Sequence, residues 1–282
     1  MGATNGNAKY CILNGNLLAM GRPDQGFLEG EKVIYEVIRI VNSAPIFLTD
    51  HLQRMTNSIA LSNLQQINIE SIVDALKLLL KKNPVEEQNV KIVCAYENIK
   101  ADPYCSVFFI PSKYPTVCER EQGVTVKTVN AIRLNPEIKA ENKTLRDYAD
   151  EIITKSGCYE VLMVNDSGLI TEGSRSNVFF IKDECVITAP SNLVLGGITR
   201  EKVLQVCANQ RIGVSMECLP LHDIGSVQAA FISGTSPGVL PINQIDNIVL
   251  NVNTDLIHRI RGGYEELIEL EITKWNKTDN RK

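Results

Sequence analysis

The stretch LITEGSRSNVFFI, residues 169–181, consists of two apolar runs separated by a small polar turn. Such runs of β-branched and aromatic residues around Gly and Ser are typical of two strands joined by a short connection. Glu172 stands where the first run gives way to the turn, a position from which a carboxylate can meet a ligand. The alternative is that Glu172 is simply solvated. The stretch therefore predicts a sheet in the second half of the chain, with a candidate functional residue at a strand end.

Two more turns of small residues follow along the chain. In LGGITR, residues 195–200, two glycines precede a helix expected over 198–208. Exposed amides at a helix N-terminus, with glycines and a Thr hydroxyl, can bind an anion such as phosphate. The segment does not match Gly-x-x-x-x-Gly-Lys-Ser/Thr, so a nucleotide P-loop is disfavoured, and a plain Gly-Gly turn is the other interpretation. The turn SGTSPG, residues 233–238, either supplies further amides to the same anion or is a tight connection.

The surrounding pattern predicts an α+β chain in two lobes. Asn14-Gly15 indicates a hairpin, and Asp50 is expected to cap the helix that follows it. Helices are expected over 50–59, 69–82, 145–156, 198–208 and 256–275, and strands over 33–41, 46–48, 90–96, 105–110, 124–129, 160–164, 177–181, 185–189 and 229–233. Pro111 to Gly123 contains two prolines and a charged cluster. We therefore expect a smaller N-terminal α/β domain over 1–115, a linker over 116–123 and a larger C-terminal domain over 124–282.

The composition favours a folded globular protein over a nucleic-acid-binding or membrane-spanning one. The 282 residues are 44% hydrophobic and 22% charged, which is typical of a folded globular chain. The net charge of −4 gives no basic field for nucleic acid, and no apolar run approaches the length of a membrane span. The eight cysteines form no Cys-x-x-Cys pair, so we expect no metal site and reduced thiols in the apolar strands. The start lacks the features of a signal peptide, and we expect a cytoplasmic protein.

Six motifs occur together in one order: YEVIRI (35–40), HLQR (51–54), IKAEN (138–142), LITEGSRSNVFFI (169–181), LGGITR (195–200) and FISGTSPGVLPI (231–242). Their order and spacing resemble the class IV pyridoxal-phosphate aminotransferases, which include branched-chain aminotransferases, D-amino-acid aminotransferases and aminodeoxychorismate lyases. The resemblance covers the chain from about residue 30 to residue 241. It implies the two-domain fold type IV, similar to D-amino-acid aminotransferase, with the larger domain binding the cofactor. It also implies a homodimer with pyridoxal 5'-phosphate between its domains.

The resemblance also implies a role for each matching residue. Lys139 would attach to the cofactor and later move a proton, for which its amine must be neutral. The family's Lys-x-x-Asn is met by Lys139 and Asn142, which favours Lys139 over the nearby Lys143. Glu172 would pair with the ring nitrogen. The remaining cofactor-binding positions are Arg54, Ile198, Thr199, Gly234 and Thr235 at the phosphate, Leu195 against the ring, and Tyr35 beside the lysine.

The substrate region departs from these relatives. Tyr96-Glu97 stands where the D-amino-acid enzymes and the lyases carry Arg-Gly, which leaves Tyr96 as a candidate substrate residue without the D-specific carboxylate clamp. We hypothesise that Arg175 or Arg39 binds a substrate carboxylate. The alternative for Arg175 is an exposed turn residue or a partner of a neighbouring acid.

The resulting hypothesis is a ping-pong transfer of an amino group between an amino acid, of branched-chain or D-amino-acid type, and a 2-oxo acid. A lyase of the aminodeoxychorismate type, which uses the same lysine, is one alternative. A cofactor-free scaffold is the other, although a scaffold has no physical need of Lys139, Glu172 and Arg54 together.

Overall fold

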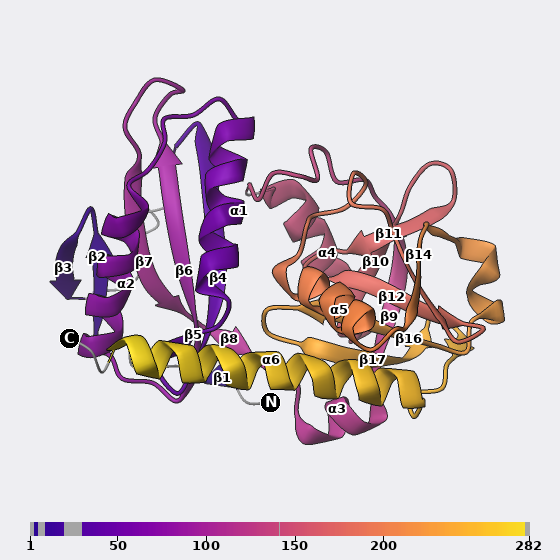
Figure 1. The fold of residues 1–282 in the computed structure, drawn as a ribbon. Helices are drawn as coiled ribbons and strands as arrows, with labels where there is room; N and C mark the ends of the chain where they lie inside the picture. Colours follow the sequence, from indigo (N-terminus) through magenta and orange to yellow (C-terminus); the bar gives the residue numbers. More distant parts are fainter. Residues whose placement is uncertain (1–2, 5–8, 20–29, 141, 280–282) are drawn as a thin grey trace. The chain divides into compact units, whose positions relative to one another are not determined.

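The computed structural model describes residues 3–4, 9–19, 30–140 and 142–279 (Figure 1). Contacts divide the chain into two compact units. Among the described residues, unit 1 comprises those up to Tyr114 together with 138–140 and 268–279, and unit 2 comprises 115–137 and 142–267. Helix α6 (Asp255–Asp279) contributes residues to both units. Residues 116–123, the expected linker, contain helix α3 (Val117–Gln122), which begins with a capping box of Thr116 and Glu119.

Unit 1 is built on a six-stranded antiparallel sheet in the order β3-β2-β7-β6-β4-β5. Asn14 and Gly15 have φ angles of 45° and 78°, so the expected hairpin between β2 and β3 is confirmed. The strands are β2 (Tyr10–Leu13), β3 (Asn16–Ala19), β4 (Lys32–Val41), β5 (Ala44–Pro45), β6 (Glu87–Tyr96) and β7 (Tyr104–Ile110). A separate pair joins β1 (Ala3–Thr4) to β8 (Ser112–Lys113).

Helices α1 (Leu48–Leu61) and α2 (Ile69–Lys82) cover one face of this sheet (Figure 1). Their apolar stripes pack with alternate strand residues, such as Ile34 and Ile38 of β4, in one buried core. Trp275, near the end of α6, packs against the same core. The bounds expected for α2 are confirmed.

The expected start of α1 at Asp50 is wrong. Residues 46–48, predicted as a strand, are not in one: the strand β5 lies just before them and ends at Pro45. Phe47 takes the left-handed conformation, with a φ of 54°. Phe47 is the N-cap of the helix, three residues before the expected cap, and Asp50 therefore lies in the first turn.

Unit 2 is built on a ten-stranded mixed sheet in the order β14-β13-β12-β16-β17-β9-β10-β11-β15, with β18 paired to β17. Strands β14, β15, β17 and β18 were not among those expected, and β11 was expected only as the first of the two apolar runs in 169–181. The strands are β9 (Val124–Asn130), β10 (Glu160–Val164), β11 (Leu169–Gly173), β12 (Asn177–Lys182), β13 (Cys185–Thr188), β14 (Gly213–Met216), β15 (Leu219–Pro220), β16 (Ala229–Gly234), β17 (Gly238–Ile245) and β18 (Ile248–Val249).

This sheet curls back on itself. Strands β12 and β11 are the first and last of six neighbouring strands, which in a flat sheet would stand about 24 Å apart. Only three residues, Ser174 to Ser176, join them, and this connection spans at most about 14 Å. The carboxylate of Glu160, at the start of β10, fixes the connection by accepting hydrogen bonds from the hydroxyls of Ser174 (2.6 Å) and Ser176 (2.9 Å) and the amide of Arg175 (3.1 Å).

Helix α5 (Ile198–Asn209) packs against β14, β16 and β17, and α4 (Lys143–Ser156) packs against β10. A short 3₁₀ helix, η2 (Leu221–Ser226), follows β15. Asn142 caps α4 by accepting a hydrogen bond from the Leu145 amide at 3.1 Å, so this helix begins two residues before the expected position. Among the helices that the structure describes, none is long and apolar enough to cross a bilayer.

Candidate functional site

Lys139 is held by its own backbone against strand β4 and helix α1 of unit 1. Its carbonyl accepts a hydrogen bond from the Tyr35 amide at 3.2 Å, and its amide donates to the Ser58 hydroxyl at 3.2 Å. The adjacent Ala140 forms a bridge with Ile34. Lys139 is half-buried, whereas Lys143 is exposed at the first residue of α4. The structure therefore fixes the position of Lys139 and leaves Lys143 on the surface.

The side chain of Lys139 lies beside an aromatic ring that a second lysine also approaches. Lys139 Nζ is 5.1 Å from the centroid of the Tyr35 ring, and Lys91 Nζ is 4.8 Å from the same centroid. Tyr35 is 6% exposed and Lys91 is 8% exposed. We name these three residues the Tyr35 cluster. The proximity of Tyr35 to Lys139 agrees with the arrangement expected from the resemblance, whereas Lys91 was not singled out by the sequence.

A buried carboxylate holds Arg54 on the helix side of the same strand. Glu36 Oε1 accepts from Arg54 Nε at 2.7 Å, and Glu36 Oε2 accepts from Arg54 Nη2 at 2.6 Å. His51 Nδ1 lies 2.7 Å from the same Oε2. We name these three residues the Glu36 cluster. Glu36 lies between Ile34 and Ile38 on the face of β4 that packs in the apolar core. A carboxylate in such a pattern is unusual, because burying an unpaired charge is costly, and this pattern in the sequence could have identified Glu36 as a candidate.

The charges of the Glu36 cluster set its protonation states. Complete burial alone would raise the pKa of Glu36, but Arg54 and His51 outweigh this effect and lower it from 4.5 to about 2. Burial lowers the pKa of His51 despite the attraction of Glu36, and the positive charges of Arg54 and Lys139 lower it further. The cluster therefore combines an ionised carboxylate, a guanidinium and a histidine whose neutral form is favoured.

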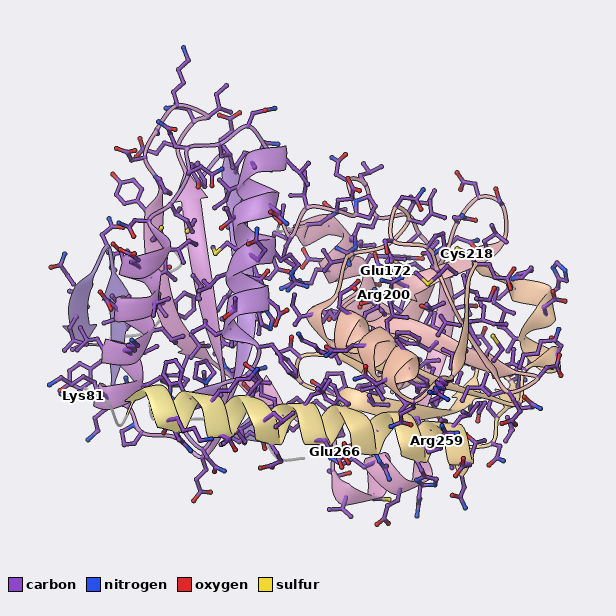
Figure 2. The ribbon with its side chains drawn as sticks, in the orientation of Figure 1. Lys81, Glu172, Arg200, Cys218, Arg259 and Glu266 are labelled. Atoms are coloured by element: carbon purple, nitrogen blue, oxygen red, sulfur yellow. The ribbon has the colours of Figure 1, made fainter. Side chains whose placement is uncertain are left out.

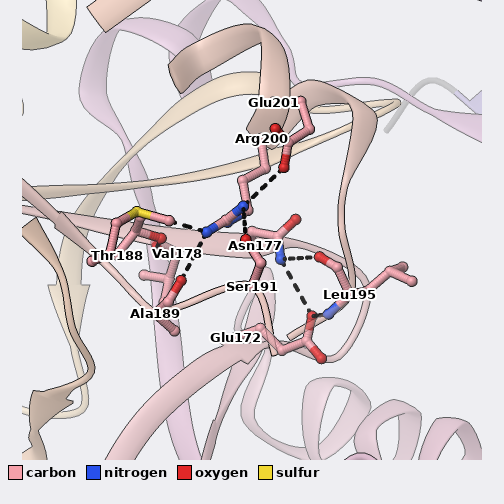
Figure 3. A network of polar contacts seen from close by, with 10 residues as sticks. Glu172, Asn177, Val178, Thr188, Ala189, Ser191, Leu195, Arg200 and Glu201 are labelled. Atoms are coloured by element: carbon pink, nitrogen blue, oxygen red, sulfur yellow. Dashed lines mark hydrogen bonds and ion pairs between the residues drawn. The ribbon is translucent and has the colours of Figure 1, made fainter. Parts of the chain in front are cut away.

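Glu172 is the centre of a second buried network, in unit 2 (Figure 3). Its Oε1 accepts a hydrogen bond from Arg133 Nε at 2.6 Å. Its Oε2 accepts from the Leu195 amide at 3.1 Å and from Asn177 Nδ2 at 3.3 Å, and Asn177 Nδ2 also donates to the Leu195 carbonyl at 3.0 Å. We name these four residues the Glu172 cluster. Glu172 is 2% exposed and multiply bonded, so the simple solvated interpretation is wrong.

The Glu172 cluster connects three chain segments that were predicted to act together. Asn177 pairs in register with Ser233, so the start of β12 lies beside the turn that contains Gly234 and Thr235. Leu195 leads through Gly197 into helix α5, whose first residues Ile198 and Thr199 are buried. The structure therefore gathers Glu172, Leu195, the α5 N-terminus and the Ser233 turn at one end of the unit 2 sheet.

Helix α5 begins close to this network. Gly197 is its N-cap and provides no capping side chain, and a Cβ atom at this position would collide with the amide oxygen of Asn177. Arg200, the third residue of α5, is completely buried. It donates to the Ala189 carbonyl at 2.8 Å and to the Ser191 hydroxyl at 3.3 Å. Figure 2 labels Glu172 and Arg200 within unit 2. Ser233 Oγ is buried with no hydrogen-bond partner in the part of the chain that the structure describes.

The three candidate substrate residues make internal contacts. Tyr96 is fully buried in the core of unit 1, and its hydroxyl donates to the Gln65 carbonyl at 2.8 Å. Arg39 bonds to Glu87 and stacks over the Tyr114 ring. Arg175 is exposed, and its Nη2 lies 2.6 Å from both carboxylate oxygens of Asp150. The arrangement of Arg175 is therefore the alternative considered for it, a turn residue paired with an acid.

Comparisons of the sequence with known proteins find aminotransferases. A family model described as "Amino-transferase class IV" matches residues 33–245. The chain is 28% identical to a putative branched-chain-amino-acid aminotransferase of Methanocaldococcus jannaschii over 89% of this chain and 91% of that protein. It is 27% identical to a D-alanine aminotransferase of Bacillus licheniformis over 83% of this chain and 88% of that protein.

Solved structures share the fold. The branched-chain aminotransferase of Thermoproteus uzoniensis, solved with norvaline, has a TM-score of 0.81 at 21% identity and covers 94% of this chain and 96% of that chain. The branched-chain amino acid aminotransferase of Thermobaculum terrenum, solved in its PLP form, has a TM-score of 0.81 at 19% identity and covers 96% of this chain and 97% of that chain.

Proposed function

We propose a role for Lys139 from the following premise: the chain belongs to the class IV aminotransferase family and is a pyridoxal-phosphate-dependent aminotransferase of fold type IV. Lys139 is, in this proposal, the residue to which the cofactor attaches. The observation that carries this proposal is the fixed backbone of Lys139 between Tyr35 and Ser58. An amine that must reach one carbon atom benefits from such positioning, because less freedom is lost when it reacts. Lys143, at an exposed helix start, lacks this support.

The polar groups of the chain fit the chemistry of this cofactor. A phosphate group requires amides and hydroxyls, and the uncapped N-terminus of α5 and the buried hydroxyl of Ser233 are of this kind. A ring nitrogen that must stay protonated requires an ionised acid, for which the multiply bonded Glu172 is suited. We propose that Ile198, Thr199, Gly234 and Thr235 bind the phosphate, and that Leu195 packs against the ring. Arg54, oriented by Glu36, would add a guanidinium to the phosphate.

When bound, pyridoxal phosphate supplies an electron-withdrawing ring that stabilises negative charge at the substrate Cα. The chain supplies the proton chemistry. Lys139 Nζ would accept the proton from the substrate Cα and later deliver it, which requires a neutral amine. Glu172 would hold the proton at the ring nitrogen, and Arg133 and Asn177 would keep its carboxylate in place. The amino group passes to a 2-oxo acid by the reverse sequence, which gives ping-pong kinetics.

The absorption spectrum tests the assignment of Lys139. We expect the purified protein with pyridoxal phosphate to show a visible band that borohydride traps on the peptide containing Lys139. Lys139→Ala should lose both the band and the trapped peptide, while Lys143→Ala, the matched control, should keep both. A band that survives in Lys139→Ala and disappears in Lys143→Ala would refute the assignment.

We propose that the donor is a branched-chain amino acid or a D-amino acid such as D-alanine, the two kinds of substrate named for the relatives. A panel of L- and D-amino acids, each followed by loss of the visible band, would identify it. Of the candidate substrate residues, Arg175 is the one we retain, because its exposed pair with Asp150 can open at small cost. A loss of more than tenfold in kcat/KM in Arg175→Ala, with cofactor retained, would support this role, and unchanged kinetics would exclude it.

We also propose a cytoplasmic homodimer. The eight cysteines are free thiols in the structure, as is usual in a reducing compartment, and the dimer follows the resemblance to the family. Light scattering of the purified protein should give twice the mass of the 282-residue chain, and a single-chain mass in the presence of cofactor would contradict the dimer.

A further inference from the structure

Lys91 is a buried lysine that the proposed reaction does not use. It lies on β6, opposite Val37 of β4, and the residue is 8% exposed. Strand residues two apart share a face, so Lys91 lies on the same face of the sheet as Tyr35. A lysine is seldom buried to this extent without a structural or chemical reason.

The Tyr35 ring brings this lysine close to Lys139. Both Nζ atoms lie about 5 Å from the same ring centroid, so they are separated by no more than about 10 Å. The quadrupole of an aromatic ring attracts a cation at its face, which favours the observed positions. Unit 1 therefore holds the amino groups of two lysines around one ring.

Other charged groups lie near the two lysines on both faces of the sheet. On the helix side of β4, the other face of the sheet, His51, Arg54 and Glu36 are bonded to one another, and His51 is near enough to feel the charge of Lys139. Further along the Lys91 face, Arg39 of β4 is bonded to Glu87 of β6. In both groups a carboxylate is bonded to an arginine, and Lys91 places its amino group over the ring of Tyr35.

We propose that Lys91 is a positioning residue whose positive charge, acting across the Tyr35 ring, favours the neutral, nucleophilic form of Lys139. This inference rests on the proposed role of Lys139. A nearby cation disfavours protonation of an amine, because the two charges repel each other. At about 10 Å and an effective dielectric constant of about 20, this repulsion corresponds to a shift of about one pH unit in the titration of the amine, and to more at shorter separation.

The test compares Lys91→Met with Lys91→Arg, which keeps the charge. In the holoenzyme, the midpoint of the pH titration of the cofactor's absorption band is expected to rise by about one unit in Lys91→Met and to stay within about 0.3 units of wild type in Lys91→Arg. Lys91→Gln serves as a second neutral variant if Lys91→Met does not fold.

A second measurement does not need the cofactor. Lysines of the cofactor-free protein are labelled by reductive ¹³C-methylation, and the Lys139 signal is identified by its absence in Lys139→Met. Its NMR titration midpoint should rise in Lys91→Met and not in Lys91→Arg. If the protein binds no pyridoxal phosphate, the proposed function fails while this measurement still decides the role of Lys91.

Two results would overturn the inference. An unchanged midpoint in both neutral variants would show that the charge of Lys91 does not reach Lys139. Equal shifts in Lys91→Met and Lys91→Arg would show that the packing of the side chain, and not its charge, is responsible. A shift in the neutral variants alone supports the inference.

Discussion

Replacing Glu36 with Gln should destabilise unit 1 by about 3 kcal/mol at pH 7. Glu36 is fully buried, and its pKa is about 2 in the folded protein against an ordinary value of 4.5. A difference of about 2.5 pKa units corresponds to roughly 3 kcal/mol of stabilisation. The substitution leaves Arg54, whose side chain is 13% exposed, beside a neutral amide, and removing the buried partner of such a pair usually costs an amount in this range.

The pH dependence of this loss has a definite sign. The folded-state pKa of Glu36 is depressed, so its stabilisation is complete above the unfolded value of 4.5 and is lost as the pH falls through 4.5 towards 2. The difference between wild type and Glu36→Gln should therefore be constant from pH 6 to pH 8 and fall to about half near pH 3.

The protein contains a reporter for this measurement. Trp275 is the single tryptophan, and its side chain packs against the core of unit 1. Urea unfolding followed by tryptophan fluorescence thus reports on the unit that contains Glu36. The matched control is Glu87→Gln, whose partly exposed carboxylate pairs with Arg39 and should contribute less than about 1 kcal/mol. A loss below about 1 kcal/mol in Glu36→Gln, or one that is independent of pH down to 3, would refute the reasoning.

Three further predictions use single substitutions or mild oxidation. Gly197→Ala should lower the free energy of unfolding by about 1–3 kcal/mol in urea titrations, because the added methyl collides with Asn177; an unchanged midpoint would contradict this. Arg175→Ala should change thermal stability by less than about 1 kcal/mol, since its ion pair is exposed, and a larger loss would show that the pair is structural. Cys94 and Cys105 are paired across β6 and β7 with their sulfurs 2.8 Å apart, so glutathione disulfide should oxidise them to a disulfide. Intact mass should show the loss of two hydrogens, and a Cys105→Ser protein that loses them equally would exclude this pair.

The sequence predicted local structure best where one residue pattern determined it. Helix α2 has the predicted bounds because its apolar period and Asn68 cap are both local. The start of α1 was displaced because Phe47 adopts a left-handed conformation that local propensity does not favour. The curl of the unit 2 sheet also could not be anticipated, since it depends on pairings between strands far apart in the chain.

The residues of the candidate site likewise fall into those that a local motif identified and those that only the folded structure brings there. Glu172 and Lys139 were found because they stand in ordered motifs, although their roles remain predictions. Arg133, which bonds to Glu172, comes from a segment 39 residues away and carries no local signal. Lys91 was missed for a related reason, because only the pairing of β6 with β4 brings it to the ring of Tyr35.

The short connection between β11 and β12 has a consequence for how this protein can change. Inserting or deleting one residue between Gly173 and Asn177 would either change the connection that Glu160 holds or shift the register of β12 against β13 and β16, which turns its side chains to the opposite face. The first outcome breaks the hydrogen bonds between Glu160 and the connection, and the second separates Asn177 from Glu172. Variation in the length of this connection should therefore be absent among functional descendants of the chain, and new specificities should arise by substitution here or by length changes in other loops.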